Sequence, residues 1–368
     1  MRSFDEAPFL VIWEVTQACD LACAHCRACA DPARHPDELT TEEGFRLLDT
    51  VKTFGDPLLV FTGGDPLKRP DLRALLEHSV RAGLRTTVTP SATPLLTAEA
   101  IAGFQRIGVA RMAVSLDGPD PITHDGFRRV HGSWARTLFA LEEARRIGLD
   151  TQVNTTVTRR NLGCLDRIAA LVDGYGAKLW SVFFLVTTGR ALVEDDLTAE
   201  EYERVFAFLY ELAKRASFDI KTTEAQHYRR YVAQRRKAEG AAARQAAPGL
   251  IARQAGINDG KGFVFVSHTG EIYPSGFLPI AGGNVRRDSL VEVYRHSPLF
   301  LTLRDSDQLG GKCGRCEYRN LCGGSRSRAY ALTGDWMEEE MRCVYEPPCH
   351  PATPKSGSDG VVTSATSR

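Results

Sequence analysis

The sequence lacks the features that mark a membrane-spanning or secreted protein. None of the apolar runs in its 368 residues approaches the roughly 20 residues needed to cross a bilayer. The apolar stretch FLVIWEV (9–15) lies near the N-terminus, but acidic residues bracket it closely, so a buried strand explains it better than a signal peptide. We therefore expect a cytoplasmic protein that does not bind a membrane.

An excess of charge of either sign is also missing. The 46 Lys and Arg residues balance 46 Asp and Glu residues, so the formal net charge is zero. A protein that binds nucleic acid over a broad surface usually carries a clear basic excess. The composition therefore gives no reason to expect nucleic acid as a partner.

Cysteine is absent from long stretches of the chain and concentrated in two short ones. None lies between Cys164 and Cys313, and the isolated Cys164 is expected to be a small buried hydrophobe. Structural disulfides are rare in the cytoplasm, so grouped cysteines indicate metal or redox chemistry. The two groups are Cys19, Cys23, Cys26 and Cys29, and Cys313, Cys316, Cys322, Cys343 and Cys349.

Short β-rich apolar runs alternate with amphipathic helical segments from residue 9 to about 215. Six such units in series predict an α/β fold, a partial (βα)6 TIM-type barrel with helices outside a parallel sheet. The predicted strands are 9–15, 57–63, 84–90, 109–116, 150–158 and 178–186. The expected division is a barrel at 1–215, a linker or helical segment at 216–256, a small domain at 257–349 that opens with a β-hairpin, and a disordered tail at 350–368.

The first cysteine group, in ACDLACAHCRACA (18–30), directly follows the first predicted strand. Barrels of this type carry their chemistry at the carboxyl ends of their strands. Structural zinc usually takes two separated pairs of ligands, whereas the C-x3-C-x2-C spacing of Cys19, Cys23 and Cys26 suits three corners of a [4Fe–4S] cube. Three thiolates leave one iron open for an external ligand. A fourth, from Cys29, would close the cluster and suit it only for electron transfer.

The second predicted strand ends in TGGDP (62–66). Glycines allow a ligand to approach the backbone closely, and Asp65 adds an anionic acceptor for an ammonium group. Alone, the motif is also ordinary turn chemistry. Its place beside the cysteine loop favours ligand binding.

The two motifs together resemble those of the radical S-adenosylmethionine (SAM) enzymes, over about residues 9–190 and 257–349. The resemblance implies that the first three cysteines hold a [4Fe–4S] cluster and that Gly63, Gly64 and Asp65 contact the SAM amino group.

The resemblance to radical SAM enzymes further implies that Ser115 in SLDGP (115–119) and Arg128 in HDGFR (124–128) contact the SAM carboxylate. His25 holds the position where relatives often place an aromatic side chain near the adenine. A buried Ser115 and an ion-paired surface Arg128 are the alternative, and Asp117 is expected to form a turn.

The second cysteine group resembles the SPASM domain that follows many radical SAM barrels. The resemblance implies one auxiliary [4Fe–4S] cluster, for two clusters in all. Full SPASM domains hold two auxiliary clusters, but Ser275 and Arg326 stand here where relatives have cysteines of the first one. Zinc remains the alternative at this group, because four thiolates also suit it. The expected ligands are Cys313, Cys316, Cys322 and Cys343.

The single auxiliary cluster resembles the branch that contains heme-biosynthesis and mycofactocin-maturation enzymes. We expect an oxidoreductase that cleaves SAM to a 5′-deoxyadenosyl radical, abstracts hydrogen from a tetrapyrrole or peptide, and passes an electron to the auxiliary cluster. A ferredoxin or flavodoxin is the expected electron donor. The alternative function is an iron–sulfur electron-transfer protein without SAM chemistry.

The segment HYRRYVAQRRK (227–237) carries a run of basic residues between the two predicted domains. Such runs are usually solvated helix faces. Because the substrate must lie between the two clusters, we also expect Arg229 or Arg230 to hold a carboxylate of an anionic substrate. No catalytic base is nominated, since Gly276 stands where some relatives place an aspartate.

Overall fold

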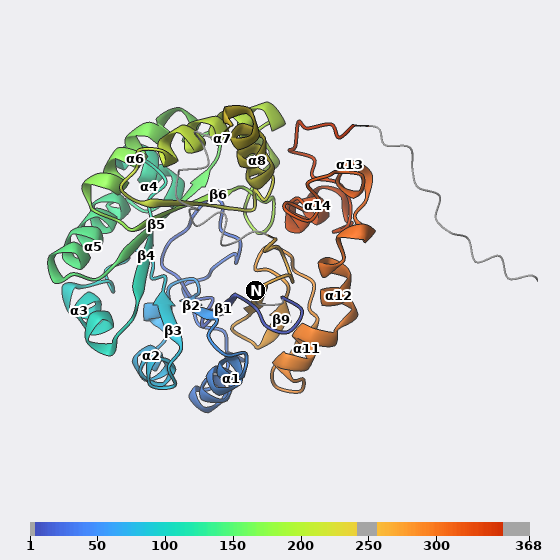
Figure 1. Cartoon of the computed structure of the whole chain (residues 1–368). Helices are drawn as coiled ribbons and strands as arrows, with labels where there is room; N and C mark the ends of the chain where they lie inside the picture. The colour runs from blue at the N-terminus through green and yellow to red at the C-terminus, as the bar shows by residue number, and fades with distance from the viewer. Residues whose placement is uncertain (1–3, 241–255, 349–368) are drawn as a thin grey trace, which may run out of the picture.

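The computed structural model describes residues 4–240 and 256–348. One ten-stranded sheet runs through this part of the chain in the order β10-β9-β8-β1-β2-β3-β4-β5-β6-β7. The helices that follow the strands form an arc outside the sheet, and α11 to α14 continue the outer layer beyond β1 (Figure 1). The expected α/β partial barrel is therefore confirmed. The predicted disordered tail, 350–368, lies outside the described residues.

The six predicted barrel strands are all present and pair in parallel with their neighbours. A seventh parallel strand, β7, pairs with β6 inside the segment expected to be a linker. Its sequence, DIKTT, is short and polar, and only Ile220 is buried, so it carries little of the usual strand pattern. The strands are β1 Leu10–Glu14, β2 Leu58–Thr62, β3 Arg85–Val88, β4 Arg111–Ser115, β5 Thr151–Val157, β6 Leu179–Phe184 and β7 Asp219–Thr223.

The predicted hairpin is present as β8 (Phe263–Val266) and β9 (Glu271–Tyr273), with β10 (Gly283–Asn284) paired to β9. Strand β8 also pairs in parallel with β1, with Leu10 opposite Phe263. The hairpin thus extends the barrel sheet past β1. Residues more than 250 positions apart in sequence become neighbours at the barrel wall for this reason.

Helix α1 (Thr41–Thr53) is capped at its N-terminus by Thr40. The Thr40 hydroxyl accepts from the Glu43 amide while the Glu43 carboxylate accepts from the Thr40 amide, which completes a capping box. The other helices are α2 Leu72–Arg81, α3 Ala98–Ile107, α4 Pro121–Arg128, α5 Ser133–Ile147, α6 Leu165–Gly174, α7 Ala199–Ala213, α8 Tyr228–Glu239, α11 Leu290–His296, α12 Pro298–Arg304, α13 Gly311–Gly314 and α14 Arg326–Thr333.

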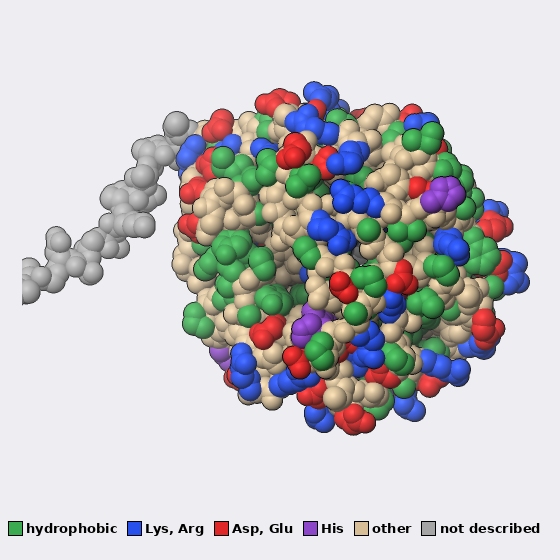
Figure 2. Space-filling view, turned by 180° about the vertical axis from the view of Figure 1, so that it is seen from behind, with side chains coloured by type: hydrophobic (Ala, Val, Ile, Leu, Met, Phe, Trp, Pro, Cys, Tyr) green, Lys and Arg blue, Asp and Glu red, His purple; other side chains and the backbone are tan. Residues whose placement is uncertain are grey.

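The hydrophobic core lies between the sheet and its helices and includes the fully buried Trp13 of β1 and Trp180 of β6. Cys164 belongs to this core, as expected. Charged side chains of both signs are interspersed over the face in Figure 2. Among the described helices, none is both long and apolar enough to span a membrane.

Candidate functional site

A cavity of about 510 Å³ occupies the interior of the barrel. Its walls include Leu10, Arg85 and Arg111, the first residues of β1, β3 and β4, and also Thr62 and Ser115, the last residues of β2 and β4. Because these residues lie at opposite strand ends, the cavity spans the length of the strands. The loop after β1, which carries the first cysteine group, borders it at the carboxyl end.

Three of the four cysteines on this loop line the cavity: Cys19, Cys23 and Cys26. Cys29 is exposed, does not line the cavity and has a left-handed backbone conformation, with φ of 49°. Backbone amides support two of the sulfurs, because Leu21 donates to Sγ of Cys19 and Ala30 donates to Sγ of Cys26, each at 3.4 Å. Three thiol groups on one side of the cavity, supported by such donors, suit a cluster with three protein ligands.

Burial raises the pKa of the Cys19 thiol to about 11. Without a metal, this thiol is therefore protonated at neutral pH. Binding of a metal centre displaces the proton, since the thiolate is the ligand.

The glycine pair after β2 allows the cysteine loop to pack directly against that strand. A Cβ at Gly63 would lie 2.4 Å from the Thr16 carbonyl oxygen, and a Cβ at Gly64 would lie 2.4 Å from that of Gln17. Both are closer than real Cβ contacts, so a larger residue at either position displaces the loop. Both glycines line the cavity, as a close backbone approach to a ligand requires.

Asp65 lies behind the cavity wall and is fully buried. Its carboxylate accepts hydrogen bonds from the amides of Leu67 (3.2 Å) and Ser91 (3.3 Å) and from the hydroxyl of Thr93 (2.7 Å). Burial raises its pKa, and these bonds oppose that rise. The side chain thus holds the ends of β2 and β3 together, and Gly63, Gly64 and Ser91 form the wall itself.

Ser115 and His25 both line the cavity. The His25 ring packs on Phe127 with centroids 4.4 Å apart. Its Nδ1 is buried with no hydrogen-bond partner among the described residues. Burial, with Arg128 and Arg190 nearby, lowers its pKa well below the usual value, so the ring is neutral at pH 7.

Arg128 is not at the surface. It lines the cavity, forms an ion pair with the buried Asp117, and donates to Sγ of Cys23 at 3.5 Å. Asp117 also accepts from the Thr156 amide at 2.7 Å, so it does more than form a turn. The guanidinium brings positive charge to the cysteine loop, where a thiolate-bound centre adds negative charge.

A second arginine beside the cysteine loop is not evident from the sequence motifs. Arg190, which follows β6, donates to the carbonyl oxygens of Cys23 (3.0 Å) and Ala30 (3.1 Å), and its own amide donates to Cys26. A Cβ at the preceding Gly189 would lie 2.3 Å from the Cys26 carbonyl oxygen. The role of the segment TGR (188–190) therefore appears only from contacts between distant parts of the chain.

The four expected ligands of the second group, Cys313, Cys316, Cys322 and Cys343, line one small pocket. Cys349 lies outside the described residues. The amides of Glu340, Tyr318 and Gly324 donate to the sulfurs of Cys313, Cys316 and Cys322 at 3.3–3.4 Å. Burial raises the pKa of Cys322 to about 12. Within residues 4–240 and 256–348, no three His, Cys, Asp or Glu side chains are grouped as ligands of a single metal ion.

The two arginines at the start of α8 point to different sites. Arg229 lines the barrel cavity and donates to the Leu321 carbonyl oxygen at 3.4 Å, next to Cys322. Arg230 is 3% exposed, pairs with Glu203, and borders the second cysteine pocket. Successive helical residues are rotated by about 100°, which separates the two side chains. Because Tyr228, Arg230 and Val232 are buried, α8 is not a fully solvated helix.

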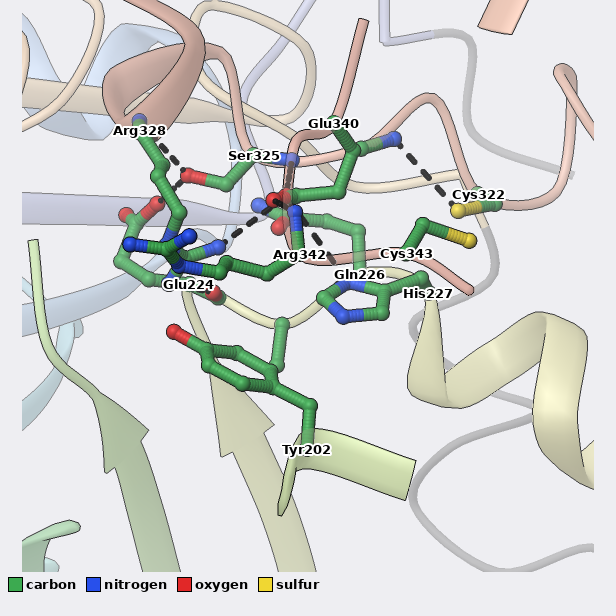
Figure 3. Close-up of polar contacts among 12 residues, drawn as sticks. Tyr202, Glu224, Gln226, His227, Cys322, Ser325, Arg328, Glu340, Arg342 and Cys343 are labelled. Carbon is green, nitrogen blue, oxygen red and sulfur yellow. Dashed lines mark hydrogen bonds and ion pairs between the residues drawn. The ribbon is translucent and has the colours of Figure 1, made fainter. Parts of the chain in front are cut away.

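A buried polar network separates the cavity from the second cysteine pocket (Figure 3). Arg328 donates to Glu340 at 3.0 Å and to the backbone oxygens of Leu185 and Glu224. Glu340 in turn lies 3.8 Å from His227, which borders the pocket. The network therefore links Glu224, which lines the cavity, to Glu340 and His227, which line the second cysteine pocket.

Two buried carboxyl groups, Glu224 and Asp259, line the cavity on this side. Glu224 accepts from the Ser325 hydroxyl, and Asp259 accepts from Ser327. Burial raises the pKa of both groups, that of Glu224 to about 8, and the like charge of Asp259 adds to the rise at Glu224. Glu224 has a positive φ of 56°, and no sequence motif marks either residue.

The fold and the cysteine-lined cavity together indicate the class of protein to which this chain belongs. Residues 13–172 match the family described as the radical SAM superfamily, and the chain belongs to that superfamily. Membership implies SAM and a [4Fe–4S] cluster as cofactors, and it favours the predicted radical chemistry over electron transfer alone.

Two relatives carry a more specific name, AdoMet-dependent heme synthase. The one from Methanosarcina barkeri is 40% identical over 347 residues, 94% of this chain and 99% of its own. The one from Oleidesulfovibrio alaskensis is 42% identical over 345 residues, 93% and 89% of the two chains. The structure of Streptococcus suis SuiB bound to S-adenosylmethionine has the same fold, with a TM-score of 0.70 and 16% identity over 92% of this chain and 78% of that one.

Proposed function

We propose that the protein is an AdoMet-dependent heme synthase that removes carboxyl groups from an iron tetrapyrrole. The observation that carries the proposal is the similarity to two enzymes of that name along nearly the whole chain. The cavity supports it, because it combines a cysteine loop of the radical SAM type with room for a second molecule between the two cysteine groups.

In this proposal, Cys19, Cys23 and Cys26 hold the cluster that binds SAM. When bound, the cluster and SAM supply a 5′-deoxyadenosyl radical that takes a hydrogen atom from the substrate. Gly63 and Gly64 provide a backbone edge for the SAM amino group, and Asp65 positions that edge through Ser91 and Thr93. Ser115 and Arg128 hold the SAM carboxylate, with Asp117 orienting Arg128.

His25 is proposed to lie beside the adenine. Its neutral ring and unpartnered buried Nδ1 suit a neutral heteroaromatic ligand better than an ion. The contact with Phe127 fixes the ring plane.

One wall of the cavity is apolar and suits the macrocycle of a tetrapyrrole. The wall is built from three adjacent strands, β8, β1 and β2, whose inward residues alternate with core residues. Burial of such a face against a flat apolar ring is favourable, at about 25 cal/mol per Å². The residues of this wall are Leu10, Ile12, Leu58, Val60, Phe263 and Phe265.

Conversion of a propionate side chain to a vinyl group releases one hydrogen atom, one CO₂ and one electron. The hydrogen atom goes to the deoxyadenosyl radical, and the electron needs an acceptor. We assign that role to a [4Fe–4S] cluster held by Cys313, Cys316, Cys322 and Cys343. Arg229, which borders both the cavity and the Cys322 segment, supports this arrangement.

The test is anaerobic incubation of the reconstituted protein with SAM, dithionite and iron–coproporphyrin. We expect one 5′-deoxyadenosine for each carboxyl group lost, and heme as the product. Formation of 5′-deoxyadenosine with unchanged porphyrin would refute the substrate assignment. Absence of 5′-deoxyadenosine from a protein with a full iron content would favour the electron-transfer alternative.

A further inference from the structure

The apolar wall of the barrel cavity faces strands that carry positive charge. Lys221 of β7, Arg111 of β4 and Arg229 of α8 all line the cavity. They come from three elements that are far apart in sequence, so no local motif brings them together. Within the described residues, the arginines that donate to the first cysteine loop are Arg128 and Arg190, not Arg111 or Arg229.

Lys221 lies close enough to Arg229 and Arg111 for both charges to act on its ammonium. Among the described residues, its ammonium has neither a hydrogen bond nor an ion pair. Burial, together with the charges of Arg229 and Arg111, lowers its pKa to about 8, against the opposing charge of Glu224. Its place in the fold therefore costs free energy while the cavity is empty of anions.

Arg111 and Arg229 are also poorly paired. Arg111 has a buried Nε without a hydrogen-bond partner among the described residues, and burial together with Arg85 lowers its pKa, with Asp150 and Asp219 opposing. Within the described part of the chain, Arg229 donates only to the Leu321 carbonyl oxygen, and burial lowers its pKa to about 10. Like charges gathered without partners indicate a site for an anionic ligand.

This group is separate from the end where SAM binds in the proposed function. Arg111 and Ser115 are the first and last residues of β4. At about 3.3 Å per residue, they lie roughly 13 Å apart along the strand. The single carboxylate of SAM near Ser115 therefore does not account for the cations around Lys221 and Arg111.

We infer that Arg111, Lys221 and Arg229 form a carboxylate subsite that holds the side chains of the substrate that the reaction leaves intact. The inference rests on the proposed function. The apolar wall holds the macrocycle, the cationic group anchors the retained carboxylates, and the reacting propionate is directed toward the cysteine loop. Charge-assisted bonds at one edge of a rigid ring fix which edge meets the radical.

The test compares the wild type with Lys221→Met, which keeps the length of the side chain and removes its charge. Binding of iron–coproporphyrin, which has four carboxylates, and iron–protoporphyrin, which has two, is measured by absorbance titration of the reconstituted full chain. We expect Lys221→Met to weaken iron–coproporphyrin binding at least tenfold and to reduce the preference for the tetracarboxylate. Lys221→Arg should retain most of the affinity, because it retains the charge.

Lys214→Met is the matched control, since Lys214 pairs with Glu211 and Glu239 on the surface. It should bind both porphyrins as the wild type does. Iron content and SAM cleavage without substrate confirm that each variant is assembled.

The outcomes separate the two proposals. Conversion of iron–coproporphyrin by the wild type, with unchanged affinity in Lys221→Met, overturns the subsite alone. Binding that depends on Lys221 without conversion overturns the proposed function alone. No binding of the tetracarboxylate by the wild type overturns both.

Discussion

Arg128 pairs with the fully buried carboxylate of Asp117 and at the same time donates to Sγ of Cys23, 3.5 Å away. This places one guanidinium between a structural anion and a proposed cluster ligand. The Asp117→Asn variant leaves the arginine buried without a charged partner, which costs about 3–5 kcal/mol in comparable pairs. We expect a matching loss of free energy of unfolding and weaker SAM binding, measured by denaturant titration and equilibrium dialysis. Asp120→Asn, whose partner Arg167 is exposed, should cost no more than about 1 kcal/mol.

Cys29 is predicted to be dispensable for the first cluster. It is exposed and does not line the cavity, unlike Cys26 three residues earlier. Cys29→Ala should therefore retain iron content and SAM cleavage, whereas Cys26→Ala should lose the SAM-binding cluster. Iron analysis and electron paramagnetic resonance check both variants. Loss of the first cluster's signal in Cys29→Ala would contradict the three-ligand assignment.

Asp65 is predicted to act on SAM by positioning the wall of the site. Asp65→Ala removes two hydrogen bonds that join the end of β2 to the segment after β3, from Ser91 and Thr93, and a local one from Leu67. We expect SAM affinity to fall roughly tenfold, because loss of a charge-assisted bond costs about 1.5–3 kcal/mol. Thr93→Val removes one of the same bonds and should give a smaller loss in the same direction. If Thr93→Val leaves SAM binding unchanged while Asp65→Ala abolishes it, the carboxylate contacts SAM directly.

The second cysteine group is predicted to hold a [4Fe–4S] cluster and not zinc. Fully reconstituted wild type should contain about eight irons per chain, and replacement of Cys313, Cys316, Cys322 and Cys343 by alanine should remove about half of them. SAM cleavage should persist in that variant while porphyrin decarboxylation stops, because the electron has no acceptor. Zinc in stoichiometric amount at this site would contradict the acceptor role.

Lys221→Met is predicted to stabilise the protein without substrate. The folded-state pKa of about 8 lies below the ordinary value of 10.5, so the unfolded chain binds more protons between these pH values. Wild-type stability therefore rises with pH across this window, and the burial penalty is fully present below pH 8. The variant should be more stable at pH 7, by as much as about 3 kcal/mol. Its advantage should shrink as pH rises toward 10.5; an advantage that is the same at pH 7 and pH 10 would show that Lys221 is not destabilised by burial.

Much of the barrel and of the first cysteine site follows from local sequence. Apolar runs with a period of two predict strands such as Thr151–Val157, and the capping residue Thr40 marks the start of α1. The spacing of Cys19, Cys23 and Cys26 after the first strand, with Gly63 and Gly64 after the second, places both motifs at one edge of the sheet. Short-range patterns suffice here because strand order follows chain order.

The other parts of the fold and of the site depend on tertiary structure alone. Strand β7 has one buried residue, so its pairing with β6 depends on the sheet already formed. The placement of β8 beside β1, which closes the apolar wall, joins segments that no local pattern relates. The local sequence alone does not distinguish Lys221, Arg111 or Glu224 from ordinary polar residues. The charge of Arg111 acts on Lys221 only because the sheet brings β4 and β7 around one cavity, where burial strengthens the field between them.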